Sequence, residues 1–237
     1  MSRKPKRSPE GPNLMGKTLI AIRKLNDAHA QVYDVIADFS LYREHLDQVM
    51  AELRPEKGKL YLDLGCGTGN LLDAAGKIGI PFIGVDFSEE MLKRAKRKCK
   101  NLVMADLHHL PFRDNSVDEI TNVNVLYQLG CPGMFLKDVC RILKPGGRVV
   151  ISTPKLGKSY RYVLGIIKTA VKNPKILTNF KGLVKYDKIN KKIIDVNPDA
   201  FYKRKKLEKM LKDFEIESVK IAYKGQNWLI SARKPAK

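Results

Sequence analysis

The chain has 237 residues, of which 43% are hydrophobic and 30% are charged, and its formal net charge is +20. This length suits one globular domain with a sizeable core, and the composition excludes a disordered tail protein, a collagen-like repeat and a disulfide scaffold. No apolar run approaches the roughly 18 residues that span a bilayer, and the basic start is followed by prolines rather than a signal core. We therefore expect a cytoplasmic protein with reduced cysteines. No Cys-x-x-Cys pair is present, so no metal site is expected.

The positive charge is concentrated at the two ends of the sequence. Residues 1–25 carry 7 basic and 1 acidic side chains, residues 26–150 carry 16 and 17, and residues 151–237 carry 22 and 7. Such an asymmetry favours attraction to phosphates of nucleic acid or to the headgroups of an anionic membrane. It is equally compatible with a role in solubility alone, and charge does not decide among these three interpretations.

The order of predicted elements indicates one domain behind a short tail. Residues 1–13, with three prolines and four basic side chains, are expected to form a disordered basic tail, and residues 14–237 a single domain. Apolar residues at helical spacing predict two N-terminal helices within residues 14–55, at Leu14–Leu25 and Ala28–Leu53.

From Lys59 onward, short apolar runs alternate with helical patterns, which is typical of a parallel sheet with helices on both faces. The predicted strands are Leu60–Leu64, Pro81–Val85, Asn101–Met104, Glu119–Val125 and Arg148–Ser152. The predicted helices between them are Gly69–Ile78, Glu89–Cys99 and Gly133–Leu143, the last ended by a Lys-Pro-Gly-Gly turn.

The C-terminal third contains a further helix, a hairpin and an insertion. Lys205–Phe214 is predicted to be helical, and the alternating runs Ile216–Tyr223 and Trp228–Ala232 suit an antiparallel hairpin. Residues 155–202 are too many for a bare loop, and the helical spacing before and after Pro174 predicts two basic amphipathic helices after the fifth strand. We expect these helices, within residues 158–186, to form a lid, whose apolar faces meet either the protein or a lipid surface.

A glycine-rich loop and an acidic residue carry the strongest functional signal. Asp63-Leu64-Gly65-Cys66-Gly67-Thr68-Gly69 follows an apolar strand and opens a helix, so a ligand can lie against the peptide groups. Asp86 ends the next strand, where a carboxylate can accept hydrogen bonds from both ribose hydroxyls of a nucleoside. The loop lacks the Gly-Lys-Ser/Thr ending of a triphosphate site and the Gly-x-Gly-x-x-Gly spacing of a nicotinamide site.

These motifs resemble the class I S-adenosylmethionine-dependent methyltransferases, in the small-molecule branch related to ubiquinone and menaquinone methyltransferases. The resemblance covers residues 28–152 closely and includes Ala105-Asp106-Leu107, His109-Leu110-Pro111-Phe112 and Arg141-Ile142-Leu143-Lys144-Pro145-Gly146-Gly147. It implies a Rossmann-like α/β fold, with a seven-stranded, mostly parallel sheet and an antiparallel C-terminal hairpin. It also implies S-adenosyl-L-methionine as cofactor and S-adenosyl-L-homocysteine as product.

The resemblance also implies a set of cofactor-binding residues. They comprise a helix residue that closes over the cofactor, the glycine loop, the ribose acid with its neighbours, the adenine-edge segment and the end of the fourth strand: Tyr33, Asp63, Gly65, Cys66, Gly67, Asp86, Phe87, Met91, Ala105, Asp106, Leu107 and Asn124. Orienting the acceptor can supply much of the catalysis, and the candidates for a base are His108, His109 and Tyr127. The alternatives are that Asp63 ties down the loop, that Phe87 only packs, and that the two histidines have structural roles.

The leading hypothesis is methyl transfer to a small or lipid-like acceptor. The end of the fourth strand, Asn122 to Gln128, lacks the Asn/Asp-Pro-Pro-aromatic motif of enzymes that methylate the exocyclic amine of adenine or the amide of glutamine. The expected partners are a small-molecule or lipid-like substrate and an anionic membrane contacted peripherally at its inner surface. The alternatives are an RNA methyltransferase that uses the basic ends and a non-catalytic cofactor-binding or membrane-associated protein.

Overall fold

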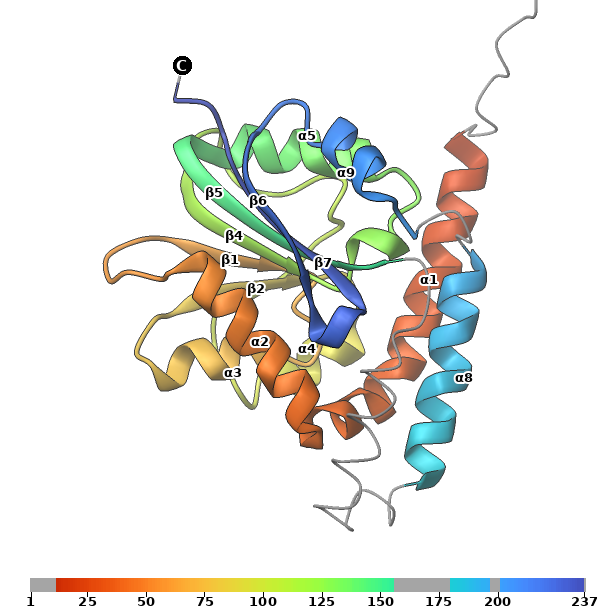
Figure 1. Cartoon of the computed structure of the whole chain (residues 1–237). Coiled ribbons are helices and arrows are strands. Elements are labelled where there is room, and N and C mark those ends of the chain that lie inside the picture. Colours follow the sequence, from red (N-terminus) through yellow and green to blue (C-terminus); the bar gives the residue numbers. More distant parts are fainter. Residues whose placement is uncertain (1–11, 156–179, 197–200, 237) are drawn as a thin grey trace, which may run out of the picture.

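Seven strands form one sheet at the centre of the molecule (Figure 1). The computed structural model describes residues 12–155, 180–196 and 201–236. The strand order is β3-β2-β1-β4-β5-β7-β6, in which β3 to β5 are parallel and β7 runs antiparallel to both β5 and β6. The predicted parallel sheet with an antiparallel C-terminal hairpin is confirmed. The strands are β1 (Tyr61–Leu64), β2 (Phe82–Asp86), β3 (Leu102–Met104), β4 (Val117–Val123), β5 (Leu143–Pro154), β6 (Glu215–Ala222) and β7 (Asn227–Arg233).

Helices cover both faces of this sheet, as predicted. The helices α2 (Ser40–Leu53) and α3 (Asn70–Lys77) pack on one face, and α5 (Pro132–Ile142) and α9 (Arg204–Met210) pack on the other (Figure 1). Each presents its apolar side to the sheet, and this burial supplies the hydrophobic stabilisation of the fold. The short helix α4 (Glu89–Ala95) follows β2 and begins with Ser88, whose hydroxyl accepts a hydrogen bond from the Met91 amide.

Two long helices lie side by side at one end of the sheet, α1 (Pro12–Tyr33) and α8 (Phe180–Val196) (Figure 1). Ile189 and Ile193 of α8 are buried in the main core, whereas its lysines are exposed. The second predicted inserted helix therefore exists, with its apolar side toward the protein. It covers 180–196 rather than ending near residue 186, because the apolar spacing continues through Ile193. The first inserted helix falls on residues 156–179, outside the described residues.

The N-terminal helices divide at a different place from the prediction. The sequence predicted a break after Leu25, but α1 continues to Tyr33, a 3-10 turn η1 covers Asp34–Asp38, and α2 begins at Ser40. The side chain of Asp34 explains the break, because it accepts a hydrogen bond from Thr68 Oγ1 at 2.6 Å and pairs with Lys98 Nζ at 3.1 Å. The chain leaves the helix where it is fixed to the glycine loop.

The predicted Lys-Pro-Gly-Gly turn is instead the first part of β5. Leu143 pairs with Val117 of β4, and after a register shift Arg148 pairs with Glu119. Gly146 lies at φ +75°, so an irregular segment at the strand's start replaces the expected loop. The difference arises because the residues on either side of the turn pair with β4, which is distant in sequence and does not enter a prediction from local patterns.

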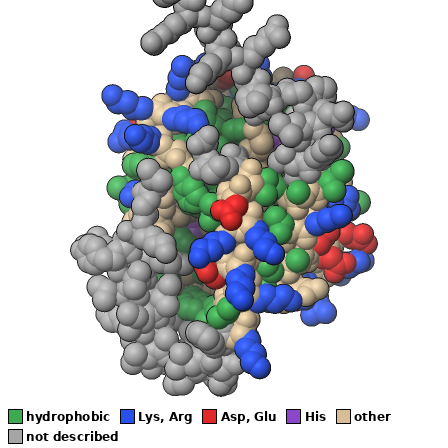
Figure 2. All heavy atoms as spheres, turned by 90° about the vertical axis from the view of Figure 1, so that its right-hand side faces the viewer, with side chains coloured by type: hydrophobic (Ala, Val, Ile, Leu, Met, Phe, Trp, Pro, Cys, Tyr) green, Lys and Arg blue, Asp and Glu red, His purple; other side chains and the backbone are tan. Residues whose placement is uncertain are grey.

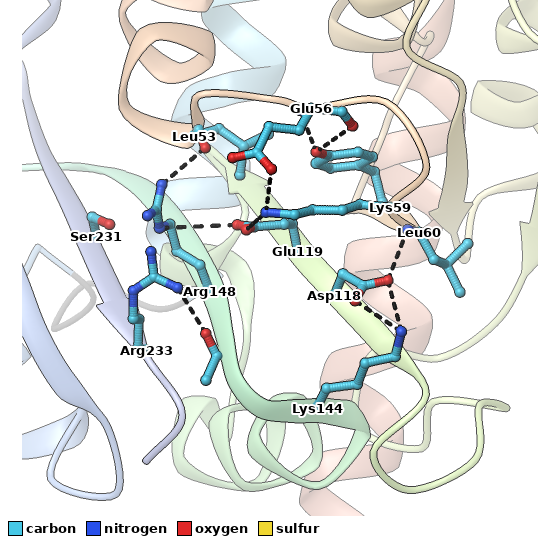
Figure 3. Close-up of polar contacts among 12 residues, drawn as sticks. Leu53, Glu56, Lys59, Leu60, Asp118, Glu119, Lys144, Arg148, Ser231 and Arg233 are labelled. Atoms are coloured by element: carbon cyan, nitrogen blue, oxygen red, sulfur yellow. Dashed lines mark hydrogen bonds and ion pairs between the residues drawn. The ribbon is translucent and has the colours of Figure 1, made fainter. Parts of the chain in front are cut away.

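Polar contacts fix the amino ends of the central strands (Figure 3). Asp118 accepts a hydrogen bond from the Leu60 amide at 2.9 Å and pairs with Lys144 Nζ at 2.8 Å. Arg148 donates to the Leu53 carbonyl at 2.9 Å and lies 3.9 Å from the buried Glu119. These charges lie at the end of the sheet opposite the glycine loop, so they serve the fold. Within the described part of the chain, no helix combines the length and apolar character needed to cross a bilayer.

Candidate functional site

The glycine loop lies at the carboxyl end of β1 and bends under the end of β2. The amides of Gly65 and Cys66 both donate to the Val85 carbonyl, at 2.7 and 3.0 Å. Gly65 lies at φ +81°, and a Cβ there would be 2.3 Å from Val125 Cγ2. The loop therefore requires glycine at this position both for its backbone conformation and for its packing.

Gly67 serves a different purpose in the same loop. It lies at φ +53°, and the nearest atom to a Cβ at this position would be Met91 Sδ, at 3.9 Å. Its open side faces a hollow that it lines together with Asp86 and Met91. A ligand can therefore approach the peptide backbone here, which a side chain would prevent.

Asp86 ends β2 at the edge of this hollow and is almost completely buried. Its Oδ2 accepts from the Gly67 amide and its Oδ1 from the Ser88 amide, each at 2.9 Å. Burial raises the pKa of Asp86 to about 6, although these backbone donors favour the carboxylate. Each oxygen keeps a lone pair for a further donor, which suits two vicinal hydroxyls.

The hollow continues toward the end of β3, where a purine would fit. Phe87 and Asp106 line both the hollow beside Gly67 and an adjoining one that also includes Arg23 and Ala105. Asp106 Oδ1 accepts from the backbone amide of His108 at 2.9 Å and lies 2.8 Å from His108 Nδ1. These contacts, led by the His108 side chain, lower the pKa of Asp106, so its other oxygen is an acceptor for an exocyclic amino group.

Asn124, directly after β4, lies between this hollow and a second one. Its φ is +58°, and the conformation is held because its amide donates to the Ser152 carbonyl at 2.8 Å. Asn227 Nδ2 donates to Asn124 Oδ1 at 2.6 Å, and Gln128 Nε2 donates to the Asn124 carbonyl at 3.1 Å. A non-glycine residue held in a strained conformation by three partners is typical of a functional site.

Helix α1 forms one wall of the cofactor-side hollow and is fastened to it. Ser88 Oγ donates to Asp27 Oδ1 at 2.6 Å, and Asn26 Nδ2 donates to Gln128 Oε1 at 3.1 Å. Ile22, Asn26 and Tyr33 of this helix all line the hollow. Ile22 and Asn26 were not predicted from the sequence, since the expected break after Leu25 separated them from the site.

The second hollow is a cavity of about 460 Å³ between α1, α8 and the ends of β4 and β5. It shares Tyr33, Asn124 and Gln128 with the cofactor-side hollow. Aromatic and amide side chains together make up most of its described lining. The aromatic and imidazole side chains in its lining are His29, Tyr33, Tyr42, Tyr127, Tyr186, Phe201 and Tyr223.

Most of the predicted cofactor residues meet in one place. Those that line the cofactor-side hollow are Tyr33, Gly65, Gly67, Asp86, Phe87, Met91, Asp106, Leu107 and Asn124. Ala105 lines the adjoining hollow. Asp63 and Cys66 line neither: both are buried beneath the loop, and Asp63 accepts a hydrogen bond from Thr121 Oγ1 at 2.7 Å. Burial raises the pKa of Asp63 to about 7.

The three candidate bases occupy three different environments. His108 lines the cofactor-side hollow and is held by Asp106, whereas His109 is exposed and lines neither hollow. Tyr127 lines the second cavity, and its hydroxyl lies 3.3 Å from Asn190 Oδ1 of α8. Burial raises the pKa of Tyr127 to about 12, so its phenol stays protonated and can donate a hydrogen bond but not take a proton.

The donor set fits S-adenosylmethionine. Asp86 would hold the ribose, Phe87 and Asp106 the purine, and the open face of Gly67 and the backbone of Asn124 the methionyl part. The hollow is lined by backbone, carboxylates and apolar side chains, and none of the described residues in its wall is a lysine or arginine. This suits a cofactor that has no phosphate.

Comparison with known proteins agrees with this site. Residues 62–151 match the family model described as a methyltransferase domain. The demethylmenaquinone methyltransferase of Staphylococcus saprophyticus is 39% identical over 124 residues, which is 48% of this chain and 53% of that protein. The chain spans about half the length of the curated relatives that it matches.

Solved structures show the same fold. A SAM-dependent methyltransferase from Aquifex aeolicus aligns with a TM-score of 0.59 at 20% identity, covering 84% of this chain and 92% of that one. The geranyl diphosphate C-methyltransferase of Streptomyces coelicolor A3(2), solved with S-adenosyl-L-homocysteine, aligns with a TM-score of 0.55 at 15% identity, covering 80% and 74%. Residues 62–151 therefore match a methyltransferase domain, the fold around them is that of solved S-adenosylmethionine-dependent methyltransferases, and the sequence is similar to demethylmenaquinone methyltransferases.

Proposed function

We propose that the protein transfers a methyl group from S-adenosylmethionine to a small-molecule acceptor held in the cavity between α1 and α8. The observation that carries this proposal is the shared wall: Tyr33, Asn124 and Gln128 line both the cofactor-side hollow and the cavity of about 460 Å³. A group in the cavity therefore lies beside the place where the methionyl part would be held.

The chain's own residues have mainly orienting tasks in this reaction. When bound, S-adenosylmethionine supplies an electrophilic methyl group on a positively charged sulfur. Asn124 and Gln128 fix the boundary between the two hollows, and Tyr127, tied to Asn190, fixes the far wall. Holding two reactants in line can supply roughly 7–11 kcal/mol of the barrier.

The lining of the cavity favours a ring-bearing, largely apolar acceptor. Aromatic side chains pack against flat apolar groups, and the amides of Asn190 and Asn227 offer hydrogen bonds to a few polar substituents. The relative from Staphylococcus saprophyticus is named for demethylmenaquinone, a ring-bearing acceptor. We propose an acceptor of this lipid-like class for the present chain.

The proposal is tested by calorimetry and a methylation assay. We expect S-adenosylmethionine to bind the purified protein, and we expect the methyl group of radiolabelled cofactor to appear in a lipid extract of the source cells only when the protein is present. The variant Asn190→Leu should reduce transfer while it leaves cofactor binding unchanged, because Asn190 lines only the acceptor cavity. Absence of cofactor binding would refute the proposal.

We further propose that the protein works in the cytoplasm and contacts anionic membranes through the exposed side of α8. Lys181, Lys185, Lys188, Lys191 and Lys192 are exposed on this helix, and Figure 2 shows Lys and Arg side chains spread over this end of the molecule. The apolar side of α8 packs inward, so the contact would be electrostatic, at about 1 kcal/mol for each basic residue near the surface.

Vesicle sedimentation tests this contact. Binding should require phosphatidylserine in phosphatidylcholine vesicles and should fall steeply with salt. The double variant Lys188→Gln/Lys192→Gln should weaken it. A complex with a structured RNA that is tight and persists at physiological salt would instead favour the RNA methyltransferase alternative.

A further inference from the structure

One of the described residues that line the acceptor cavity is a histidine, His29 on α1. His29 lies one helical turn before Tyr33, which borders both hollows. The side chain of His29 is 3% exposed and lines the cavity of about 460 Å³. It is therefore near the junction where acceptor and cofactor would meet.

The environment of His29 leaves one of its ring nitrogens without a hydrogen bond. Its Nε2 is buried and has no partner among the described residues. The ring is held by aromatic contacts, at 5.1 Å and 87° to the ring of Tyr33 and at 4.7 Å to the ring of Tyr186 of α8. An orphaned buried nitrogen costs free energy in the free protein, and buried polar groups normally have partners. A hydroxyl of the acceptor would supply the missing hydrogen-bond partner.

The protonation state of His29 leaves the ring able to accept a hydrogen bond. Burial lowers its pKa to about 4, and no charged group contributes to this shift. The imidazole is therefore neutral at physiological pH and has a lone pair to offer. The charged side chains in the lining of the same cavity are Asp187, Lys191 and Lys155.

We propose that His29 is the general base of this methyltransferase and that its acceptor carries an aromatic hydroxyl. This inference rests on the proposed function. The acceptor oxygen forms the new O–CH₃ bond as the S–CH₃ bond breaks, and the electron pair of that bond stays on sulfur. The hydroxyl proton passes to the unpaired imidazole nitrogen and later to water. The positive charge that His29 gains replaces the one lost at sulfur, so the buried charge is unchanged by the step.

Four other titratable side chains in and around the two hollows are less suited to this task. Burial raises the pKa values of Tyr127 and Tyr42 to about 12, so both phenols stay protonated and act as hydrogen-bond donors. His108 lines the other hollow and is bound to Asp106. His45 is fully buried, lines neither hollow, and its Nε2 is paired with Ser152 Oγ at 3.0 Å.

The test uses two probes, 1-naphthol and 1-methoxynaphthalene, in the second of which a methyl group replaces the hydroxyl hydrogen, with the intact chain and S-adenosylhomocysteine present. In the wild type, 1-naphthol should bind about threefold to tenfold more tightly, the ratio expected for one hydrogen bond. In His29→Phe, which keeps an aromatic ring between Tyr33 and Tyr186, this preference should disappear. The control His109→Phe changes an exposed residue outside both hollows and should keep it.

Of two further measurements, the first uses the wild type alone and needs no turnover, and the second compares turnover in the variant and the wild type. The ¹⁵N signals of the His29 ring in the wild type should shift on addition of 1-naphthol and not on addition of 1-methoxynaphthalene. With S-adenosylmethionine, methylation of 1-naphthol should be slower by about 100-fold or more in His29→Phe, while cofactor affinity stays unchanged.

The outcomes separate this inference from the function on which it rests. Failure of the wild type to bind S-adenosylmethionine would refute the proposed function. Normal cofactor binding, together with unshifted His29 signals, no binding of 1-naphthol, or an equal preference in wild type and His29→Phe, would overturn the role of His29 alone.

Discussion

Replacing Asp86 with alanine should cost the protein most of its affinity for S-adenosylmethionine. Each carboxylate oxygen of Asp86 already holds one backbone amide at 2.9 Å, and each can take one ribose hydroxyl. A hydrogen bond to a charged group is worth about 1.5–3 kcal/mol. Because burial of the carboxylate opposes its ionisation, we expect a net loss of about 2–4 kcal/mol, or roughly 30-fold to 700-fold in Kd.

Calorimetry at several pH values measures this loss and its electrostatic part. The pKa of Asp86 is raised to about 6 in the free protein, so wild-type affinity should weaken as the pH falls through 6 and the carboxyl becomes protonated. The variant Asp86→Asn has no such titration and should show no loss in this range. The control Asp118→Asn lies at the opposite end of the sheet and should bind the cofactor normally. Unchanged affinity in Asp86→Ala, or the same pH profile in Asp86→Asn as in the wild type, would refute the assignment.

Three further predictions concern stability and are measured by chemical or thermal unfolding. Gly65→Ala should lower the free energy of unfolding by about 2–4 kcal/mol, because its Cβ would lie 2.3 Å from Val125 and the backbone has positive φ. Adding Val125→Ala should restore the part that comes from the steric clash and not the part that comes from the backbone conformation. Burial raises the pKa of Asp63 to about 7, so wild-type stability from this group is complete at low pH and is lost as the pH rises through 7. At pH 8 the free energy of unfolding of Asp63→Asn should therefore exceed that of the wild type, on the order of 3 kcal/mol, and this difference should disappear toward pH 4. A difference that stays constant with pH would contradict the assigned burial effect. Ile193→Asp should lower the melting temperature strongly, whereas Val184→Asp, on the exposed side of the same helix, should change stability by about 0.5 kcal/mol or less; equal effects would contradict the inward orientation of α8.

The part of the site that local sequence patterns predicted is the part built by consecutive residues. The glycine loop, Asp86 and Asp106 lie at or just after the carboxyl ends of β1, β2 and β3, and parallel strands bring their carboxyl ends together. Their convergence therefore follows from strand type and order alone. The sheet and its hairpin could be predicted for a similar reason, because the spacing of apolar residues and the residue types of turns are local features of the sequence.

On the acceptor side, local patterns indicated Tyr127 and the inserted helix but not His29 or Asn190. His29 and Asn190 belong to helices far apart in sequence, and they meet because α1 and α8 pack side by side. A lone histidine on an apolar helix face gives no local sign of the cavity beside it. The boundary of α1 was also predicted wrongly, because the break at Asp34 depends on its bond to Thr68. For Asp63, the sequence showed an acid in the loop, but its buried partner Thr121 lies on β4.

The fastening of α1 has a kinetic consequence. This single helix contributes Ile22 and Asn26 to the cofactor-side hollow and His29 to the acceptor cavity, and it is tied to the start of α4 by the hydrogen bond that Ser88 donates to Asp27. Any outward swing of α1 that frees the cofactor would also dismantle the acceptor wall. If the cofactor exchanges through such a swing, the acceptor cavity can form only after the cofactor is in place, and steady-state kinetics should show an ordered sequence in which the cofactor enters first and leaves last.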